Sequence, residues 1–243
     1  MMRKALLIGT PGIDLPGVAK DLSNYQQFML SPLGGLWSPS EIVTLQNPSK
    51  NEVSEQLATL RSADYSMVIF AGHGSHPKQN GSTFIALQPG VEMNVDTLKV
   101  GAPKHTMILD CCRKLERAVL TEDVIAKADS QVLELNPLDC RKYYDQTITQ
   151  CENGLVILFA CEIDETAGES STTGGHYSSA LLNVVKNWRA TINIDTSKNY
   201  RTLSITKAHN LAVPIVQQKT GNRQNPTSEY PRSTPHFPFG IIA

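Results

Sequence analysis

Two residues that together can perform nucleophilic catalysis each follow a predicted strand. His73 stands two residues after the end of the apolar run 65–71, within the sequence Gly-His-Gly. Cys112 stands two residues after the end of the run 106–110. A thiolate is a strong nucleophile, the ordinary pKa of a thiol is about 8.5, and a nearby imidazole can take its proton. The pair indicates a nucleophilic cysteine assisted by a histidine base.

The backbone around these two residues suits the same chemistry. The glycines that flank His73 let the chain turn sharply and approach a ligand. The N–H groups of Gly74 and Cys112 are candidate donors to a developing oxyanion. Each motif alone also fits a structural role, because a cysteine at a strand end is commonly a small buried hydrophobic residue. The occurrence of both, each at the end of a strand, favours the catalytic interpretation.

Short apolar runs alternate with amphipathic segments along the chain. The runs predict strands at residues 4–9, 42–45, 65–71, 106–110 and 154–160. Helical spacing of apolar residues occurs at 18–28, at 53–60 behind a Ser49/Glu52 capping box, and at 177–188. Strands that alternate with helices predict an α/β fold with a mostly parallel sheet and helices on both faces. Functional residues of such sheets gather at the carboxyl ends of the strands, where His73 and Cys112 are predicted.

Three segments depart from this alternation. Residues 80–96 contain glycine and proline between β-rich pieces and predict a hairpin. Residues 113–152 are rich in charge and predict, at least in part, a long connection between two buried strands. The tail 221–238 is dense in Asn, Pro, Ser and Arg and predicts irregular structure.

Composition excludes several classes of protein. The 243 residues carry 22 Lys and Arg against 23 Asp and Glu, a net charge of −1. This balance lacks the basic footprint of a nucleic-acid binder or of a polybasic membrane patch. Five cysteines without a C-x-x-C spacing argue against a disulfide framework and a zinc ribbon. The longest apolar run, 155–161, is too short to span a bilayer, so we expect a cytoplasmic protein with reduced thiols.

These motifs resemble those of the caspase and metacaspase cysteine peptidases. Phe70-Ala-Gly-His73-Gly-Ser75 is similar to the histidine motif of that family, and Ile108-Leu-Asp110-Cys-Cys112 is similar to its Asp-x-Cys nucleophile motif. Weaker likeness extends along nearly the whole chain, at residues 4–9, 15–21, 158–167, 175–182, 224–226 and 237–239. One departure follows the nucleophile, where metacaspases often have His-Ser-Gly and this chain has Arg-Lys-Leu.

The resemblance implies a caspase-like three-layer α/β/α sandwich with a six-stranded, mostly parallel sheet. It implies one peptidase domain over residues 1–243, with a large-subunit-like part at 1–112, an inter-subunit linker at 113–152 and a small-subunit-like part at 153–243. It also implies a cysteine endopeptidase that works through an acyl-enzyme and needs no cofactor. By position His73 is the base and Cys112 the nucleophile, because Cys111 stands one residue too early in the motif.

The resemblance further implies an S1 pocket, which holds the side chain before the cleaved bond. In metacaspases that pocket is lined by the acid two residues before the nucleophile and by an acid of the first helix, which Asp110 and Asp21 match. Two carboxylates favour a cation, and arginine pairs with them bidentately, so we expect cleavage after Arg or Lys. The alternative for Asp21 is a favourable position near a helix N-terminus.

Five other acids lack an oxygen-ligand motif, so we assign no metal and interpret them as solvated loop charge: Glu152, Glu162, Asp164, Glu165 and Glu169.

If the preferred side chain is basic, the linker offers sites for self-processing, because exposed linkers tolerate proteolysis. The candidate residues are Arg113, Lys114, Arg117, Lys127, Arg141 and Lys142. The expected partners are a protein or peptide substrate and an activating protein or small signalling nucleotide, since bacterial relatives often act as effectors of antiviral defence. A second hypothesis is a non-catalytic caspase-like binding module, which the missing His-Ser-Gly favours and the retained His73 and Cys112 oppose. The sequence leaves the oligomeric state open.

Overall fold

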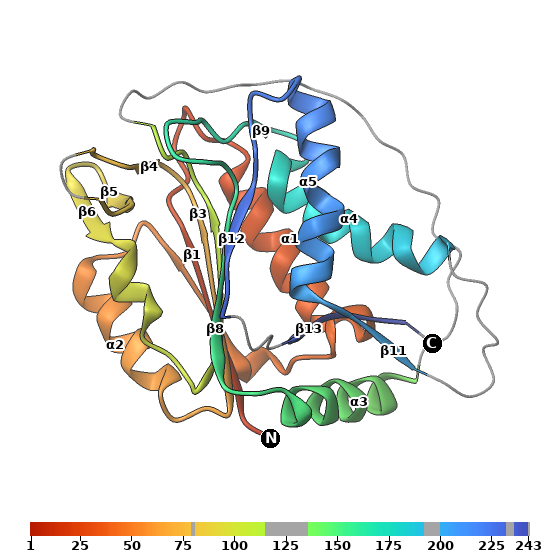
Figure 1. Ribbon diagram of the computed structural model, residues 1–243. Helices are drawn as coiled ribbons and strands as arrows, with labels where there is room; N and C mark the ends of the chain where they lie inside the picture. The colour runs from red at the N-terminus through yellow and green to blue at the C-terminus, as the bar shows by residue number, and fades with distance from the viewer. Residues whose placement is uncertain (79–80, 115–135, 192–199, 232–235, 243) are drawn as a thin grey trace.

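A six-stranded sheet runs through the middle of the molecule (Figure 1). The structure, a computed structural model, describes residues 1–78, 81–114, 136–191, 200–231 and 236–242. The strands lie in the order β12 (Thr227–Glu229), β8 (Gly154–Phe159), β7 (Lys104–Asp110), β3 (Tyr65–Ala71), β1 (Arg3–Gly9) and β2 (Ile42–Gln46). All neighbouring pairs are parallel except β12 and β8, which are antiparallel. The expected six-stranded, mostly parallel sheet is confirmed.

Side chains of the central strands pack alternately into two separate hydrophobic clusters. Leu7 of β1 packs into one cluster, whereas its neighbours Leu6 and Ile8 pack into the other. In β3 the same division separates Ile69 from Phe70. Because successive side chains of a strand point to opposite faces, the two clusters lie on opposite faces of the sheet. The central strands therefore read as continuous apolar runs, as a sheet that is covered on both sides requires.

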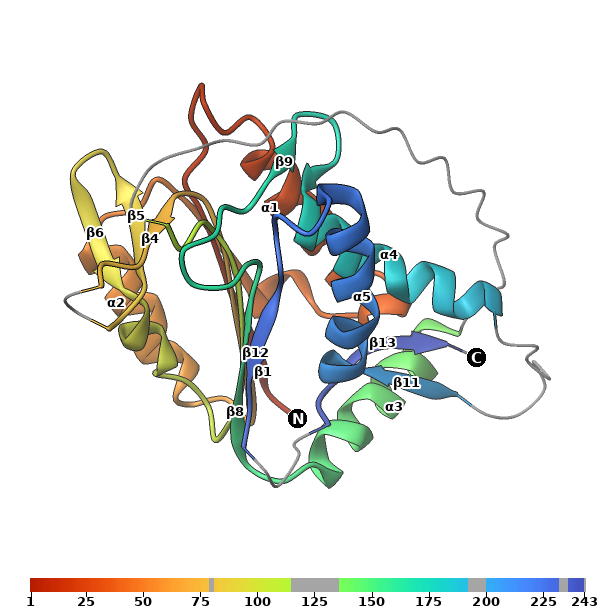
Figure 2. The same cartoon turned by 45° about the horizontal axis from the view of Figure 1, so that its top comes forward.

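Helices cover both faces and complete the three layers (Figures 1 and 2). Helix α2 (Lys50–Leu60) covers one face together with the hairpin of β5 (Phe84–Gln88) and β6 (Val91–Asn94). The other face carries α1 (Val18–Leu30), α3 (Pro137–Gln150), α4 (His176–Thr191) and α5 (Ile205–Thr220). Short strand pairs are formed by β4 (Gly74–Ser75) with β5, β9 (Glu169–Ser170) with β10 (Gly174–Gly175), and β11 (Arg201–Ser204) with β13 (Pro238–Ile242). Short 3₁₀ helices lie at Pro32–Gly34, Pro39–Glu41 and Val95–Lys99.

Capping residues account for where two of the helices begin. The predicted capping box of α2 is present: Glu52 N–H donates to Ser49 Oγ at 3.3 Å, and Ser49 N–H donates to Glu52 Oε2 at 2.8 Å. Helix α3 begins behind Asn136, whose side-chain oxygen accepts from the N–H groups of Leu138 and Asp139. Each cap satisfies N–H groups that have no partner inside the helix.

The structure corrects two expectations about irregular segments. The tail 221–238 contains β12, which pairs with the edge strand β8, so the prediction of irregular structure is wrong for those residues. An exposed edge strand has unpaired backbone N–H and C=O groups, so a neighbouring segment can pair with it even where the side chains of that segment do not favour a strand. The segment 113–152 contains helix α3 at its end, and residues 115–135 lie outside the described part. None of the helices in the described ranges has the length and apolarity needed to cross a membrane.

Candidate active site

The carboxyl ends of β1, β3 and β7 lie in register at one edge of the sheet. Thr10 N–H donates to the Ala71 carbonyl at 3.1 Å, and Gly72 N–H donates to the Asp110 carbonyl at 3.1 Å. These bonds continue the pairing past β1 and β3. The loops that follow the three strands therefore start side by side, which is the arrangement that the sequence prediction of a shared edge requires.

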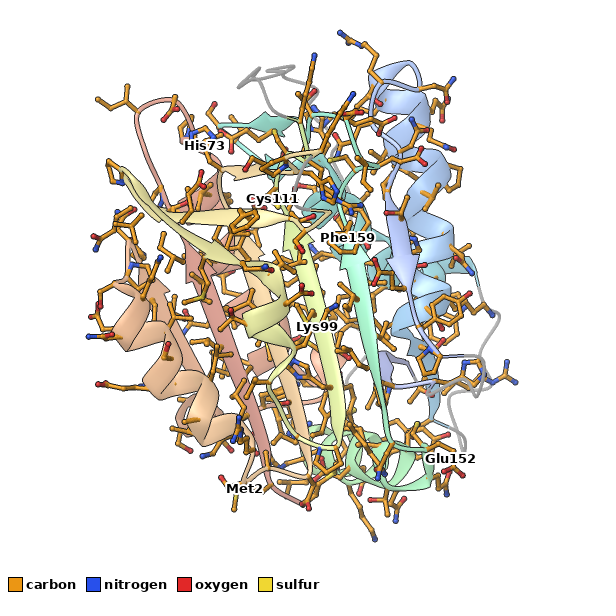
Figure 3. The ribbon with its side chains drawn as sticks, turned by 60° about the vertical axis from the view of Figure 1, so that its left-hand side comes forward. Met2, His73, Lys99, Cys111, Glu152 and Phe159 are labelled. Carbon is orange, nitrogen blue, oxygen red and sulfur yellow. The ribbon has the colours of Figure 1, made fainter. Side chains whose placement is uncertain are left out.

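One pocket at this edge brings the predicted site residues together. His73, Cys112, Gly74, Asp21 and Asp110 all line it. Figure 3 shows the labelled His73 and Cys111, the neighbour of Cys112, at this end of the sheet. The cavity volume is about 30 Å³, the share of a single water molecule in the liquid. The pocket is therefore narrow.

The two adjacent cysteines have different surroundings. Cys111 is 1% exposed and packs in the core cluster under β5 and β6, and burial raises the pKa of its thiol well above the ordinary value. Cys112 is partly exposed, and its thiol donates to the Ala167 carbonyl at 3.7 Å. Burial is also the largest cause that raises the pKa of Cys112, with the Asp110 charge acting in the same direction. The accessible thiol is thus protonated at neutral pH and needs a base to become a nucleophile.

Glycines on both sides of His73 allow the close contacts around it. Gly72 has φ +154°, and a Cβ there would collide with Thr10 Oγ1. A Cβ at Gly74 would lie 2.7 Å from Cys111 Sγ and 2.7 Å from the Cys112 carbonyl oxygen. Side chains at either position are therefore excluded by packing. The loop that carries His73 lies directly against the loop that carries Cys112.

The pairing of β4 with β5 orients the Gly74 backbone. Ala86 N–H donates to the His73 carbonyl at 2.9 Å, and Gly74 faces Ile85. In an antiparallel ladder this pattern makes Gly74 and Ile85 a non-hydrogen-bonded pair, so the Gly74 N–H points away from β5. Its role as an oxyanion donor, with Cys112 N–H, stays a prediction that this orientation favours.

The two predicted S1 acids are buried side by side and carry internal hydrogen bonds. Both Asp21 oxygens accept from Gly175 N–H, at 2.9 and 3.0 Å. Asp110 Oδ2 accepts from Ser178 N–H at 3.0 Å and from the Ser178 hydroxyl at 2.6 Å. Burial raises the pKa of both carboxyls, and the Asp110 charge adds to the rise at Asp21. A Cβ at Gly174 or Gly175 would collide with these carboxylates, so the glycines close the pocket over them.

A third acid, Glu169, joins the pocket and corrects a sequence interpretation. It is 5% exposed, lines the cavity, and accepts from Gly17 N–H at 3.0 Å. Burial is the largest cause that raises its pKa, and Asp110 adds to the rise. The interpretation of Glu169 as solvated loop charge is therefore wrong. No pattern in the sequence marks it, because its partner Gly17 lies 152 residues away.

Comparisons with known proteins identify the family of this chain and agree with its fold. The profile of the caspase-domain family matches residues 2–237. The chain belongs to the caspase-domain family. A crystal structure of caspase-1 from Spodoptera frugiperda is similar, with a TM-score of 0.57 and 12% sequence identity, over 94% of this chain and 86% of that one. A structure of a Geobacter sulfurreducens protein has a TM-score of 0.60 and 14% identity over 100% of both chains. A search of curated proteins finds no match.

Membership of the caspase-domain family supports a cysteine peptidase type of hydrolase, whose substrate is a protein. The segment 224–226, part of the resemblance noted above, is hydrogen-bonded to the segment 160–168. Gly168 N–H donates to Gln224 Oε1 at 3.0 Å, and Gln224 Nε2 donates to the Ala160 carbonyl at 2.9 Å. Asn225 donates to Glu165 through its N–H at 2.7 Å and its amide at 2.6 Å. The Glu165 carboxylate thus accepts two hydrogen bonds from the C-terminal tail, so it is not only a solvated charge.

Arg113 stands where metacaspases often have histidine, and it is a buried anchor. Its guanidinium lies 4.0 Å above the Phe159 ring, and its Nε donates to Thr83 Oγ1 at 3.2 Å. Its backbone N–H donates to the Glu165 carbonyl, and its carbonyl accepts from Asp164 N–H. The residue that follows Cys112 is therefore held by both its backbone and its side chain.

This burial corrects the set of predicted processing sites. Arg113 is 6% exposed, so the bond after it is not presented to a protease. Arg141 and Lys142 lie within helix α3, where Arg141 pairs with Glu41 at 2.6 Å. Lys114 is exposed. The remaining candidates, Arg117 and Lys127, lie outside the described residues.

In the described part of the chain no group of His, Cys, Asp and Glu side chains is arranged to hold a metal ion.

Proposed function

We propose that this caspase-domain protein is a cysteine endopeptidase in which Cys112 attacks the peptide carbonyl and His73 takes the thiol proton. The observation that supports this most is that an accessible thiol and an imidazole line the same narrow pocket. The pKa of Cys112 is raised by burial, so proton transfer to the base must accompany attack. The core position of Cys111 leaves Cys112 as the available nucleophile.

The reaction then follows from the positions of these groups. Cys112 Sγ forms a bond to the carbonyl carbon, and the N–H groups of Gly74 and Cys112 stabilise the oxyanion. When the C–N bond breaks, His73 returns the proton to the leaving amine, and a thioester on Cys112 remains. Water, deprotonated by His73, hydrolyses that acyl-enzyme and restores the thiol.

The preferred substrate carries arginine or lysine before the cleaved bond. Asp21 and Asp110 are buried together, and burial raises the pKa of each carboxyl, so ionisation of either one in the pocket is costly without a neighbouring positive charge. A guanidinium or ammonium in the pocket would supply that charge. Glu169 adds a third carboxyl on the same wall. Charge complementarity of this kind disfavours an acidic substrate side chain.

The free chain must open before it can bind such a side chain. The cavity has room for about one water molecule, and both S1 acids already accept hydrogen bonds from Gly175 or Ser178. We therefore propose that substrate, a partner protein or a small signalling nucleotide shifts the 168–178 segment away from the acids. An activated effector in antiviral defence is one role that fits this requirement.

Fluorogenic peptides with Arg, Lys or Asp before the scissile bond test the proposal. Wild type should cleave the Arg and Lys peptides, and Cys112→Ala and His73→Ala should lose that activity by at least about 10³-fold. Asp110→Asn should weaken Arg cleavage without creating Asp cleavage. Preference for Asp, or equal residual activity in the dyad variants, would overturn the mechanism.

Covalent labelling separates the enzyme from the non-catalytic binding module. An arginyl chloromethyl ketone should alkylate Cys112, detected by peptide mass spectrometry, and spare Cys151, which is also partly exposed. Absence of label at Cys112 with every candidate activator would favour the binding module.

A further inference from the structure

The loop between β1 and α1, residues 10–17, reaches the proposed base. His73 Nε2 and Asp14 Oδ2 lie 2.7 Å apart, the distance of a charge-assisted hydrogen bond. The side chain of Asp14 is 58% exposed and that of His73 is 19% exposed, so the pair lies at the rim of the pocket. This contact joins the loop after β1 to the loop after β3, and neither sequence motif includes it.

The surrounding loop holds the Asp14 carboxylate in place. Leu15, the next residue, packs with Val18 and Ala71 in a small buried cluster. Leu15 N–H donates to the Gly12 carbonyl at 3.2 Å, which closes a tight turn around Asp14. A Cβ at Gly12 would lie 2.7 Å from Asp14 Oδ1, so the carboxylate folds over a position that has no side chain. The loop thus presents this carboxylate in a defined place.

The hydrogen bond decides which nitrogen of His73 can act as the base. An ionised carboxylate only accepts hydrogen bonds, so Nε2 must carry the hydrogen that it donates to Asp14. In a neutral imidazole the lone pair then lies on Nδ1. The nitrogen that takes the Cys112 proton is therefore Nδ1. When that proton arrives, the ring becomes a cation whose partner, Asp14, is already in contact.

We propose that Asp14 is the positioning residue of His73: its carboxylate fixes the Nε2–H tautomer and ring orientation and stabilises the imidazolium. This role rests on the proposed function, because it has meaning only if His73 is the base for Cys112. Asp14 does not touch the reacting atoms and acts through His73 alone. The proposal predicts an effect on proton transfer, not on substrate binding.

The test follows the rate of Cys112 alkylation by iodoacetamide, with Cys151 of the same chain as internal reference, and kcat and KM on an arginyl peptide. Asparagine carries no negative charge to accept the hydrogen bond from His73 Nε2. Asp14→Asn should therefore slow alkylation of Cys112 and lower kcat about 10–100-fold. KM should stay within about twofold. Asp14→Glu should recover part of the loss. Asp164→Asn, the same change at an exposed acid paired with Lys78, should match wild type.

Gly12→Ala provides an independent route to the same loss. The added methyl group displaces the Asp14 carboxylate, so this variant should lower kcat in the Asp14 background and change nothing further in the Asp14→Asn background. Equal losses from Gly12→Ala in both backgrounds would show that the methyl group acts on the loop and would contradict the assigned role.

The outcomes distinguish this inference from the proposed function. If His73→Ala leaves the alkylation rate of Cys112 unchanged, the His73/Cys112 dyad is wrong and the role of Asp14 is wrong with it. If His73→Ala slows alkylation while Asp14→Asn behaves as wild type, the dyad stands and the positioning role is refuted. Slowing in both variants, without further loss in the double variant, supports the proposal.

Discussion

Replacing Arg113 with alanine should destabilise the protein and loosen the segment after Cys112. The substitution removes the guanidinium that lies 4.0 Å above the Phe159 ring and the Nε donor to Thr83 Oγ1. It keeps the backbone bonds of residue 113 to Glu165 and Asp164. Thr83 Oγ1 also keeps its contact with His76 Nδ1 at 3.0 Å, so no buried hydroxyl loses every partner.

The size of the loss can be worked from these contacts. A desolvated cation–π contact contributes up to about 2 kcal/mol, and the hydrogen bond from Nε contributes about 1 kcal/mol. The free energy of unfolding should therefore fall by about 3 kcal/mol, with a fall in Tm of about 6–12 °C for a chain of this length. Arg113→Lys keeps a cation near Phe159 and loses the planar group, so it should lose about half as much.

Urea unfolding followed by tryptophan fluorescence and scanning calorimetry measures the change. Lys114→Ala is the matched control, because the side chain of Lys114 lies next to Arg113 in the sequence and is exposed. This substitution should shift the free energy of unfolding by less than about 0.5 kcal/mol. The rate of Cys112 alkylation should also change in Arg113→Ala and not in the control. A loss below about 0.5 kcal/mol in Arg113→Ala would refute the claim that this side chain anchors the loop.

Three further predictions follow from the pocket and the linker. Burial raises the pKa of Asp21 and Asp110 in the folded state. This pair therefore contributes most to the free energy of unfolding below the ordinary carboxyl pKa of about 4. The contribution falls as the pH rises towards the raised pKa values. Urea titrations between pH 4 and 7 should show a flatter pH dependence in Asp21→Asn/Asp110→Asn, and a slope equal to that of wild type would contradict this. Gly175→Ala places a methyl group against Asp110 Oδ2 and should abolish cleavage after Arg while the chain still folds by circular dichroism; retained cleavage would show that the 174–175 segment does not set the pocket. Intact mass of active protein should show cuts at or beyond Lys114 and none after Arg113, and Cys112→Ala should remain whole; an uncut active wild type would exclude required self-processing.

Much of the sheet could be predicted because its strands are locally encoded. The apolar runs at 65–71 and 4–9 match β3 and β1 to within a residue, since a strand buried on both faces is apolar at most of its positions. The Ser49/Glu52 capping box marks the start of α2 by the same local logic. The tail strand β12 could not be found in this way, because it pairs with β8 through its backbone and carries no apolar pattern.

By itself the sequence predicted a cysteine–histidine chemistry and the end of the sheet at which its two residues lie. His73 and Cys112 each follow a strand, and parallel strands bring their carboxyl ends to one edge, so the spacing along the chain was sufficient. Only the tertiary structure decided what surrounds them. Asp14 at His73, Glu169 at Gly17 and Arg113 above Phe159 are contacts between segments far apart in the chain. Such contacts depend on how the loops pack, and no local pattern records them.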